Sequence, residues 1–148
     1  MKKVQEYIHK DITCVNENSS LRRVINTMKL HRLSALPVVN KLGEYVGCIS
    51  EQDILNEAIP AYMKKMYDTS FMAGLDQITI HLIKKLDHKI IDFIDEKYPC
   101  VSPDDSMSYA ADLLYRQKGT ILPVVEGKTL IGLLTRIEIL SLSLDINY

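Results

Sequence analysis

The sequence predicts an α+β fold of two β-α-β-β-α repeats, packed as a pseudo-two-fold pair and joined by a helical connector. The main observation is that "SALPVV", at Ser34–Val39, returns as "TILPVV", at Thr120–Val125. The same spacing aligns Cys14 with Cys100. An internal repeat at a fixed spacing indicates two copies of one structural unit.

The chain of 148 residues is long enough for one compact domain or two interdependent halves. We expect repeat 1 at residues 1–58 with its core at 12–55, and repeat 2 at residues 98–148 with its core at 98–140. Residues 59–97 are predicted to form a helical connector, for which three roles are open: covering the repeats, lining a dimer interface, or shielding a pocket.

Each repeat opens with a short β-like segment, "ITCV" or "YPCV", followed by polar residues typical of a helix N-cap. A helix should follow, because apolar residues then recur at positions i, i+3, i+4 and i+7. They are Leu21, Val24, Ile25 and Met28 in repeat 1, and Met107, Ala110, Ala111 and Leu114 in repeat 2. Gly119 stands where the second of these helices should end in a left-handed residue.

A β-hairpin is predicted next, from "ALPVV", "NKLGE" and "YVGCI" in repeat 1 and from "ILPVV", "EGK" and "TLIGLL" in repeat 2. We expect the proline at a strand start or edge, since it cannot donate a ladder hydrogen bond. The final helix should begin near Ser50 or Thr135, with two aliphatic residues on its apolar side. These are Ile54 and Leu55, or Ile139 and Leu140. A three-stranded sheet with helices on one face leaves the other face for the second copy.

The connector is predicted to be helical in pieces. Apolar residues follow helical spacing at Ile78, Leu82, Ile83 and Leu86, and again at Ile90, Phe93 and Ile94. Its segment "YMKKMYDTSFMAG" is rich in Met and aromatic residues, which we interpret as packing residues.

Composition excludes several classes of function. The net charge is −1 with basic and acidic residues interspersed, so we expect no nucleic-acid partner. The apolar runs are far shorter than the roughly 20 residues of a membrane span, and no signal peptide is recognised, so we expect a cytoplasmic protein. The three cysteines form no CxxC and the four histidines show no ligand spacing, so we expect no metal.

Two segments in register, "GCISEQDIL" and "GLLTRIEIL", are the candidates for a binding site. In one interpretation they are capping boxes, in which the hydroxyl and the carboxylate bond the free N–H groups of the helix start. Thr135 with Glu138 suits this role. In the other, the helix N-terminus and the hydroxyl bind a phosphate while the carboxylate accepts both hydroxyls of a ribose. Ser50 with Asp53 suits that role, because Asp is a poorer box partner than Glu.

Two longer segments carry a family resemblance: "HRLSALPVVNKLGEYVGCISEQDIL" and "KGTILPVVEGKTLIGLLTRIEIL". They closely resemble paired CBS domains, also called a Bateman module, over Ile12 to Leu55 and Tyr98 to Leu140. The resemblance implies an adenosyl ligand such as AMP, ADP, ATP or S-adenosylmethionine, held in clefts between the repeats, with no cofactor required. It also implies a flat homodimer.

Carried over residue by residue, the resemblance implies two clefts that mix the repeats. The first combines the ribose- and phosphate-binding Ser50 and Asp53 with the adenine-contacting Pro99, Gly119, Thr120 and Ile121. The second combines Thr135, Arg136 and Glu138 with Thr13, Leu33, Ser34 and Ala35. Glu138 replaces the usual Asp, so the first cleft is the better candidate. The connector is roughly twice the expected length for the family.

The function expected is a regulatory module that binds an adenosyl ligand and signals through a change of conformation or dimer geometry. Its output would go to a separate effector protein, since no effector domain is recognised. The alternative is a dimerisation scaffold that binds no ligand. We expect no enzyme and assign no catalytic residue, because the sequence has no P-loop and no nucleophile elbow.

Overall fold

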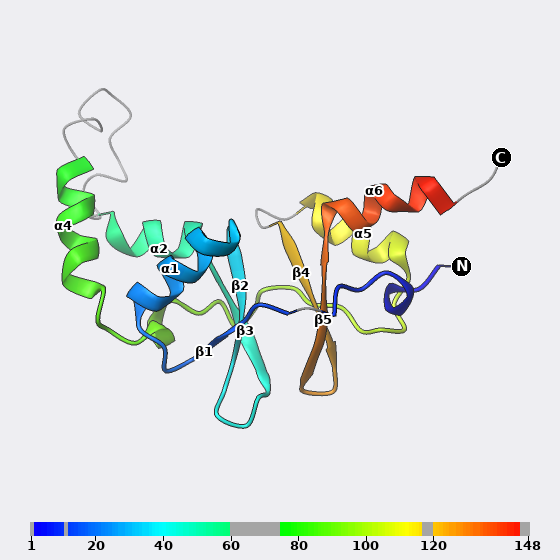
Figure 1. The fold of residues 1–148 in the computed structure, drawn as a ribbon, viewed down its shortest axis with the longest axis horizontal. Helices are drawn as coiled ribbons and strands as arrows, with labels where there is room; N and C mark the ends of the chain where they lie inside the picture. The colour runs from blue at the N-terminus through cyan, green and yellow to red at the C-terminus, as the bar shows by residue number, and fades with distance from the viewer. Residues whose placement is uncertain (1, 11, 60–74, 117–119, 146–148) are drawn as a thin grey trace.

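The computed structural model describes residues 2–10, 12–59, 75–116 and 120–145. Figure 1 shows two α+β units side by side, with the sheets toward the middle of the molecule. The elements are η1 (Val4–Glu6), β1 (Val15–Asn16), α1 (Leu21–His31), β2 (Ala35–Val39), β3 (Tyr45–Ser50), α2 (Glu51–Ala58), α4 (Leu75–Lys85), η3 (Ile90–Phe93), α5 (Met107–Arg116), β4 (Ile121–Glu126), β5 (Thr129–Thr135) and α6 (Arg136–Asp145). The predicted fold class is confirmed.

The first strand of each repeat is shorter than predicted. In repeat 1, β1 pairs in parallel with β2 and the sheet order is β1-β2-β3. In repeat 2 only an isolated parallel bridge, Val101 to Val124, stands in that place, so the sheet has two strands, β4 and β5. The strands are short because Ile12 and Tyr98, earlier in the two segments, pack instead into the core between the repeats.

Both prolines lie inside their strands and not at a strand start. Pro123 is on an edge strand as predicted, because the sheet of repeat 2 has only β4 and β5, but Pro37 is in the middle strand of its sheet, where the prediction is wrong. Pro37 is the third residue of β2 and lies opposite Cys48 of β3. The parallel partner β1 begins only opposite Val38. Because β1 does not extend alongside Pro37, the missing N–H of the proline costs the sheet no ladder bond on that side.

The first helix of each repeat buries the predicted apolar face, including Leu21, Val24 and Met28 in α1. Ser20 caps α1, since its Oγ accepts a 3.2 Å hydrogen bond from the Arg23 backbone N–H. The helix ends at Arg32, which is left-handed at φ 53°. The predicted helix end at Gly119 lies outside the described residues.

The last helix of each repeat buries less of its aliphatic pair than predicted. Ile54 is buried, but Leu55 is 42% exposed. Ile139 packs on the core of repeat 2, whereas Leu140 is 66% exposed. Successive residues on a helix are about 100° apart, so the narrow contact with the sheet covers only the first of each pair.

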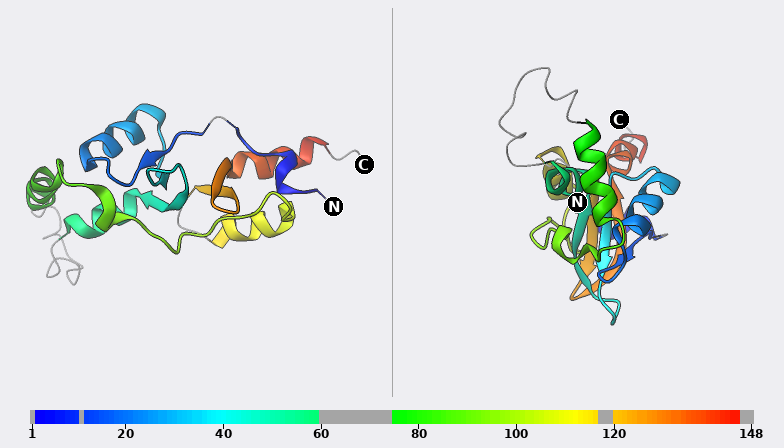
Figure 2. Two further views of the ribbon diagram at one scale, coloured as in Figure 1. Left: turned by 90° about the horizontal axis from the view of Figure 1, so that it is seen from below. Right: turned by 90° about the vertical axis from the view of Figure 1, so that its left-hand side faces the viewer.

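Two segments, each just upstream of a repeat, cross to the opposite repeat. We call residues 3–9 strap 1 and residues 89–95 strap 2. Strap 1 lies on repeat 2 and strap 2 lies on repeat 1, as Figure 2 shows from below. The antiparallel bridges are Lys3 to Ser106 and His9 to Leu133 for strap 1, and Lys89 to Ser20 and Asp95 to Cys48 for strap 2. The straps interlock the two halves.

Each strap ends against the glycine of a binding-site candidate segment. A Cβ added to Gly47 would lie 2.5 Å from the Asp95 carbonyl oxygen, and one added to Gly132 would lie 2.9 Å from that of His9. Gly47 also has φ +152°, a conformation that side chains with a Cβ rarely adopt. The glycine of the motif is therefore required because backbone from the other half of the chain lies against it.

The two repeats meet around a pseudo-two-fold axis. Ser34 Oγ and Thr120 Oγ1, equivalent atoms of the repeated segment, are hydrogen-bonded at 2.6 Å. β2 and β4 contact each other beside this pair. The core between the repeats consists of Ala35, Cys48, Tyr98, Ile121 and Leu133, with Ile12 and Tyr45 packed against it.

The described part of the connector contains α4, which packs on α2, and then strap 2 with its short helix η3. Ile78, Ile90 and Phe93 are buried, while Ile83 is 61% exposed. The Met- and aromatic-rich segment at residues 62–74 lies outside the described residues. Within the ranges that the structure describes, no helix combines the length and the apolar character needed to cross a membrane.

Candidate functional site

The first candidate pair, Ser50 and Asp53, sits where β3 runs into α2. Ser50 Oγ accepts a hydrogen bond from the Asp53 backbone N–H at 3.1 Å. In return Asp53 Oδ2 accepts from the Ser50 backbone N–H at 3.1 Å and from Ser50 Oγ at 2.8 Å. The capping box is complete, so the structural interpretation of the motif applies to Ser50 and Asp53 as well.

The carboxylate of Asp53 keeps one oxygen for another partner. Both bonds that it accepts go to Oδ2. Its Oδ1 accepts no hydrogen bond from the chain over the described ranges 2–10, 12–59, 75–116 and 120–145. The structural and the ligand-binding roles of this residue are therefore compatible, because one oxygen fixes the helix start and the other is open.

A polar cleft of about 270 Å³ opens beside Asp53. It lies between α2 and strap 2, and its lining residues are Asp53, Asn56 and Glu57 from the helix and Asp92, Phe93, Ile94 and Asp95 from the strap. Four carboxyl groups thus border one small space, which gives it a negative electrostatic potential.

Two residues of the inter-repeat core, Cys48 and Tyr98, bond the backbone of Asp95 through their backbone N–H groups, and their side chains stay protonated. Burial raises the pKa of the Cys48 thiol to about 12, and the nearby carboxylates of Asp95 and Asp53 add to the shift. Burial is also the main cause that raises the pKa of Tyr98. The Tyr98 hydroxyl donates a 2.8 Å hydrogen bond to the carbonyl oxygen of Ile121 in β4. Both residues belong to repeat 2, so this bond fixes the residue that follows strap 2 to the first residue of β4.

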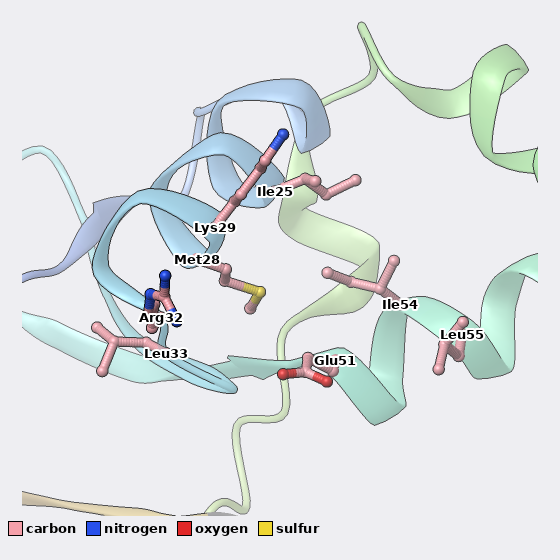
Figure 3. Close-up of a pocket in the computed structure, with 8 residues that line it drawn as sticks. All are labelled: Ile25, Met28, Lys29, Arg32, Leu33, Glu51, Ile54 and Leu55. Carbon is pink, nitrogen blue, oxygen red and sulfur yellow. The ribbon is translucent and has the colours of Figure 1, made fainter.

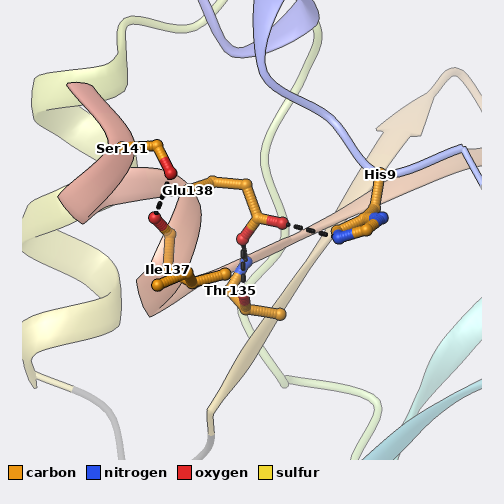
Figure 4. A network of polar contacts seen from close by, with 5 residues as sticks. All are labelled: His9, Thr135, Ile137, Glu138 and Ser141. Carbon is orange, nitrogen blue, oxygen red and sulfur yellow. Dashed lines mark hydrogen bonds and ion pairs between the residues drawn. The ribbon is translucent and has the colours of Figure 1, made fainter. Parts of the chain in front are cut away.

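The second candidate pair, Thr135 and Glu138, starts α6. Glu138 Oε2 accepts from the Thr135 backbone N–H at 2.7 Å and also from Thr135 Oγ1. The other oxygen, Oε1, lies 3.0 Å from Nε2 of His9 at the end of strap 1. Glu138 is only 8% exposed. Figure 4 shows His9 reaching the carboxylate from the side opposite the helix.

Sequence reasoning did not identify His9 as a member of this site. Its nearest sequence neighbours carry no motif, and it is remote from Glu138 along the chain. One signal was available in the repeat itself, because the spacing that pairs the two LPVV segments also aligns His9 with Asp95. The histidine becomes a site residue only through the crossing of strap 1.

The predicted adenine-contacting residues lie mostly around the pseudo-two-fold axis. Ser34 bonds Thr120 across the axis, Ala35 is opposite Ser50 in the sheet, and Ile121 is opposite Thr135. Thr13 and Pro99 are half-buried beside the inter-repeat core residues Ile12 and Tyr98. Arg136 is exposed at the start of α6, and Gly119 lies outside the described residues. Their assignment to an adenine stays a prediction.

Leu33 lies in a different place, a groove of about 530 Å³ between α1 and α2 of its own repeat. Figure 3 shows the residues that line this groove: Ile25, Met28, Lys29, Arg32, Leu33, Glu51, Ile54 and Leu55. The lining is mainly aliphatic, with three charged side chains among the lining residues. It does not contain Ser50 or Asp53.

The described residues contain no group of three or more His, Cys, Asp or Glu side chains placed to hold a metal ion. The two candidate pairs therefore present hydroxyls, carboxylates and helix N-termini as their chemistry. These groups suit a polyhydroxylated or phosphorylated ligand.

Comparison with known proteins decides the family. The profile described as CBS domain matches the chain twice, at residues 4–59 and 90–145. The chain belongs to the CBS-domain family. Both matches begin within the straps, so each CBS repeat includes the segment that crosses to its partner. The recognition made from the two LPVV segments is confirmed.

The chain is similar to a curated relative in sequence and to solved structures in fold. An uncharacterized protein of Methanocaldococcus jannaschii is 30% identical over 134 residues, covering 82% of this chain and 80% of its own. The CBS domain of a membrane protein from Sphaerobacter thermophilus is 25% identical with a TM-score of 0.69, covering 96% of this chain and 88% of its own. The structure of CBSX2 in complex with AMP has a TM-score of 0.70 and 23% identity, covering 98% of both chains.

Proposed function

We propose that this CBS pair is a regulatory module that binds an adenosyl ligand at the Ser50 and Asp53 cleft. The observation that carries the proposal is the hydrogen bonding of the Asp53 carboxylate. Its Oδ2 is fixed by the helix start while its Oδ1 faces no partner from the described chain, beside a cleft of about 270 Å³. A carboxylate held in this way is suited to accept hydrogen bonds from a ribose diol.

Family membership supports the same ligand class. CBS pairs serve as regulatory modules, and the fold of this chain is shared with a protein solved in complex with AMP. The half-buried Pro99 and Thr120 flank the inter-repeat core next to Tyr98, and they would supply the apolar contacts for the adenine ring. The ligand would then contact both repeats, so that its binding would favour one relative position of the two.

The charge of the cleft ranks the candidate ligands. Asp53, Glu57, Asp92 and Asp95 surround the space with carboxylates, which repel a free phosphate and attract a cation. S-adenosylmethionine carries a positive sulfonium and an ammonium group, whereas AMP, ADP and ATP carry negative phosphates. The proposal therefore expects S-adenosylmethionine to bind more tightly than the three nucleotides at low ionic strength.

A thermal-shift panel with AMP, ADP, ATP and S-adenosylmethionine tests the proposal. A ligand at about 100 times its Kd stabilises the native state by roughly 2.7 kcal/mol, a clear rise in Tm. The rise should be lost in Asp53→Asn, which keeps an oxygen to cap the helix, and kept in the control Glu126→Gln, an exposed carboxylate at the end of β4 that does not line the cleft. No rise with any of the four compounds would favour the alternative of a scaffold that binds no ligand.

The signal would pass to a second molecule through the outer helices. Ile137, Leu140 and Leu144 form one exposed apolar stripe on α6, at 60%, 66% and 82% exposure. A stripe of this kind is typical of a helix that packs against another helix. We therefore include a homodimer in the proposal, with a separate effector protein as the recipient of the signal. Light scattering with and without the binding ligand measures the change in assembly.

A further inference from the structure

The two straps place different side chains at one equivalent position. Strap 1 ends on repeat 2 at His9, which exchanges two backbone hydrogen bonds with Leu133, at 2.9 and 3.0 Å. Strap 2 ends on repeat 1 at Asp95, which exchanges two with Cys48, at 3.2 and 2.8 Å. Leu133 and Cys48 each follow the motif glycine, so His9 and Asp95 occupy corresponding places beside the two candidate sites.

In repeat 2 the strap side chain, His9, binds the carboxylate of Glu138. Glu138 is bound on Oε2 by Thr135 and on Oε1 by His9 Nε2 at 3.0 Å, and its side chain is 10% exposed. A ribose diol that took the place of His9 at Oε1 would have to displace this side chain. The buried Glu138 would then lose His9, its basic partner in the described part of the chain, which opposes the exchange.

In repeat 1 the strap side chain leaves the carboxylate open. Asp95 is itself acidic and cannot pair with Asp53. Its Oδ1 instead accepts a 3.0 Å hydrogen bond from the Lys97 backbone N–H. The strap and α2 stand apart here, forming the cleft that contains Asp53. Like charges on the two walls disfavour closure of the gap without a ligand.

From this difference we infer that the chain has one adenosyl site and not two. His9 takes the place of a ligand at Glu138, which makes Glu138 an anchor for strap 1, while the cleft at Asp53 remains for the ligand. The inference rests on the proposed function, because it assigns the ligand of that function to one of two equivalent motifs. His9 is the residue that determines the stoichiometry.

Isothermal titration calorimetry of the full chain tests the inference, with S-adenosylmethionine, AMP, ADP and ATP titrated separately. For any of these that binds, we expect one molecule per chain. Asp53→Asn should weaken binding at least tenfold, and the matched variant Glu138→Gln should change Kd less than twofold. Both substitutions keep an oxygen at the helix start, and the melting transition of each variant verifies that it is folded.

The outcomes separate the inference from the proposed function. If none of the four compounds binds, the proposed function fails. If two molecules bind per chain, or if Glu138→Gln weakens binding as much as Asp53→Asn, the proposed function stands and the single-site inference is overturned. One molecule per chain with sensitivity at Asp53 alone supports both.

The chain contains a matched pair of reporters for a second measurement. Cys14 and Cys100 occupy equivalent positions, both are exposed, and each follows a predicted adenine-contacting residue, Thr13 or Pro99. Bound S-adenosylmethionine or nucleotide should slow iodoacetamide alkylation of Cys100 and leave Cys14 unchanged. Equal protection of both cysteines, or protection of Cys14 alone, would overturn the inference.

Discussion

The two junctions between a strap and the repeat it crosses to have the same backbone pairing, but the strap side chain is basic at one, His9, and acidic at the other, Asp95. On both sides a strap residue pairs with the residue that follows the motif glycine, and on both sides a carboxylate stands one helical turn into the last helix. Repeat 2 brings a histidine to that carboxylate, whereas repeat 1 brings an aspartate. The two repeats share the backbone pairing that the fold needs but differ in the strap side chain. This difference gives the junction of repeat 2 a structural role.

The two motif glycines differ in how closely the strap backbone approaches them. Gly47→Ala should lower the free energy of unfolding by about 3 kcal/mol, because its new Cβ meets a carbonyl oxygen at 2.5 Å and its φ is unfavourable for Ala. Gly132→Ala should cost about 1.5 kcal/mol, because the corresponding approach is 2.9 Å. Urea unfolding of both variants measures the difference. A larger loss in Gly132→Ala would contradict this ranking.

The strap side chains differ in what they contribute to stability. His9→Ala should lower the unfolding free energy by about 1 kcal/mol, because it leaves the buried Glu138 without its basic partner. The loss is small because the His9 side chain is 61% exposed and solvent screens the contact. Asp95→Ala should change it by less than about 0.5 kcal/mol, since the lost bond to Lys97 is offset by removal of a like charge near Asp53. Chemical denaturation compares the two. Equal losses would mean that the charge difference between the junctions has no energetic consequence.

A small and equal effect is expected where the repeats are equal, at the hydroxyl pair on the pseudo-two-fold axis. Ser34→Ala and Thr120→Val should each lower the free energy of unfolding by about 1 kcal/mol or slightly less, the usual net value of one hydrogen bond. The double variant should cost less than the sum of the two, since both substitutions remove the same bond. A double-mutant cycle by urea unfolding gives the coupling. Additive losses would show that the two hydroxyls act independently.

The sequence was sufficient for the features that depend on neighbouring residues. Helical periodicity located α1 and α5 and their buried faces, and the apolar runs with polar turns located the two hairpins. The repeat predicted the pairing of two units, and the motif spacing predicted capped helix starts at Ser50 and Thr135. These properties are local or follow from duplication, so they can be predicted from the order of residues alone.

The chain alone could not show that residues 3–9 and 89–95 exchange repeats. The helical spacing of Ile90, Phe93 and Ile94 predicted a helical piece but not its partner, because strand pairing between distant segments depends on the path of the whole backbone. The position of Pro37 in a middle strand and the outward Leu140 were missed for a related reason, since both depend on how far a neighbouring element extends.

By itself the sequence determined the fold class, the family and the two motifs, because periodicity and repetition are properties of residue order. The tertiary structure alone decided that His9 meets Glu138 while Asp53 keeps an open oxygen beside a cleft. The physical reason is that an ion pair or a cleft depends on distance in space, and the crossing of the straps brings together residues that are far apart in the chain.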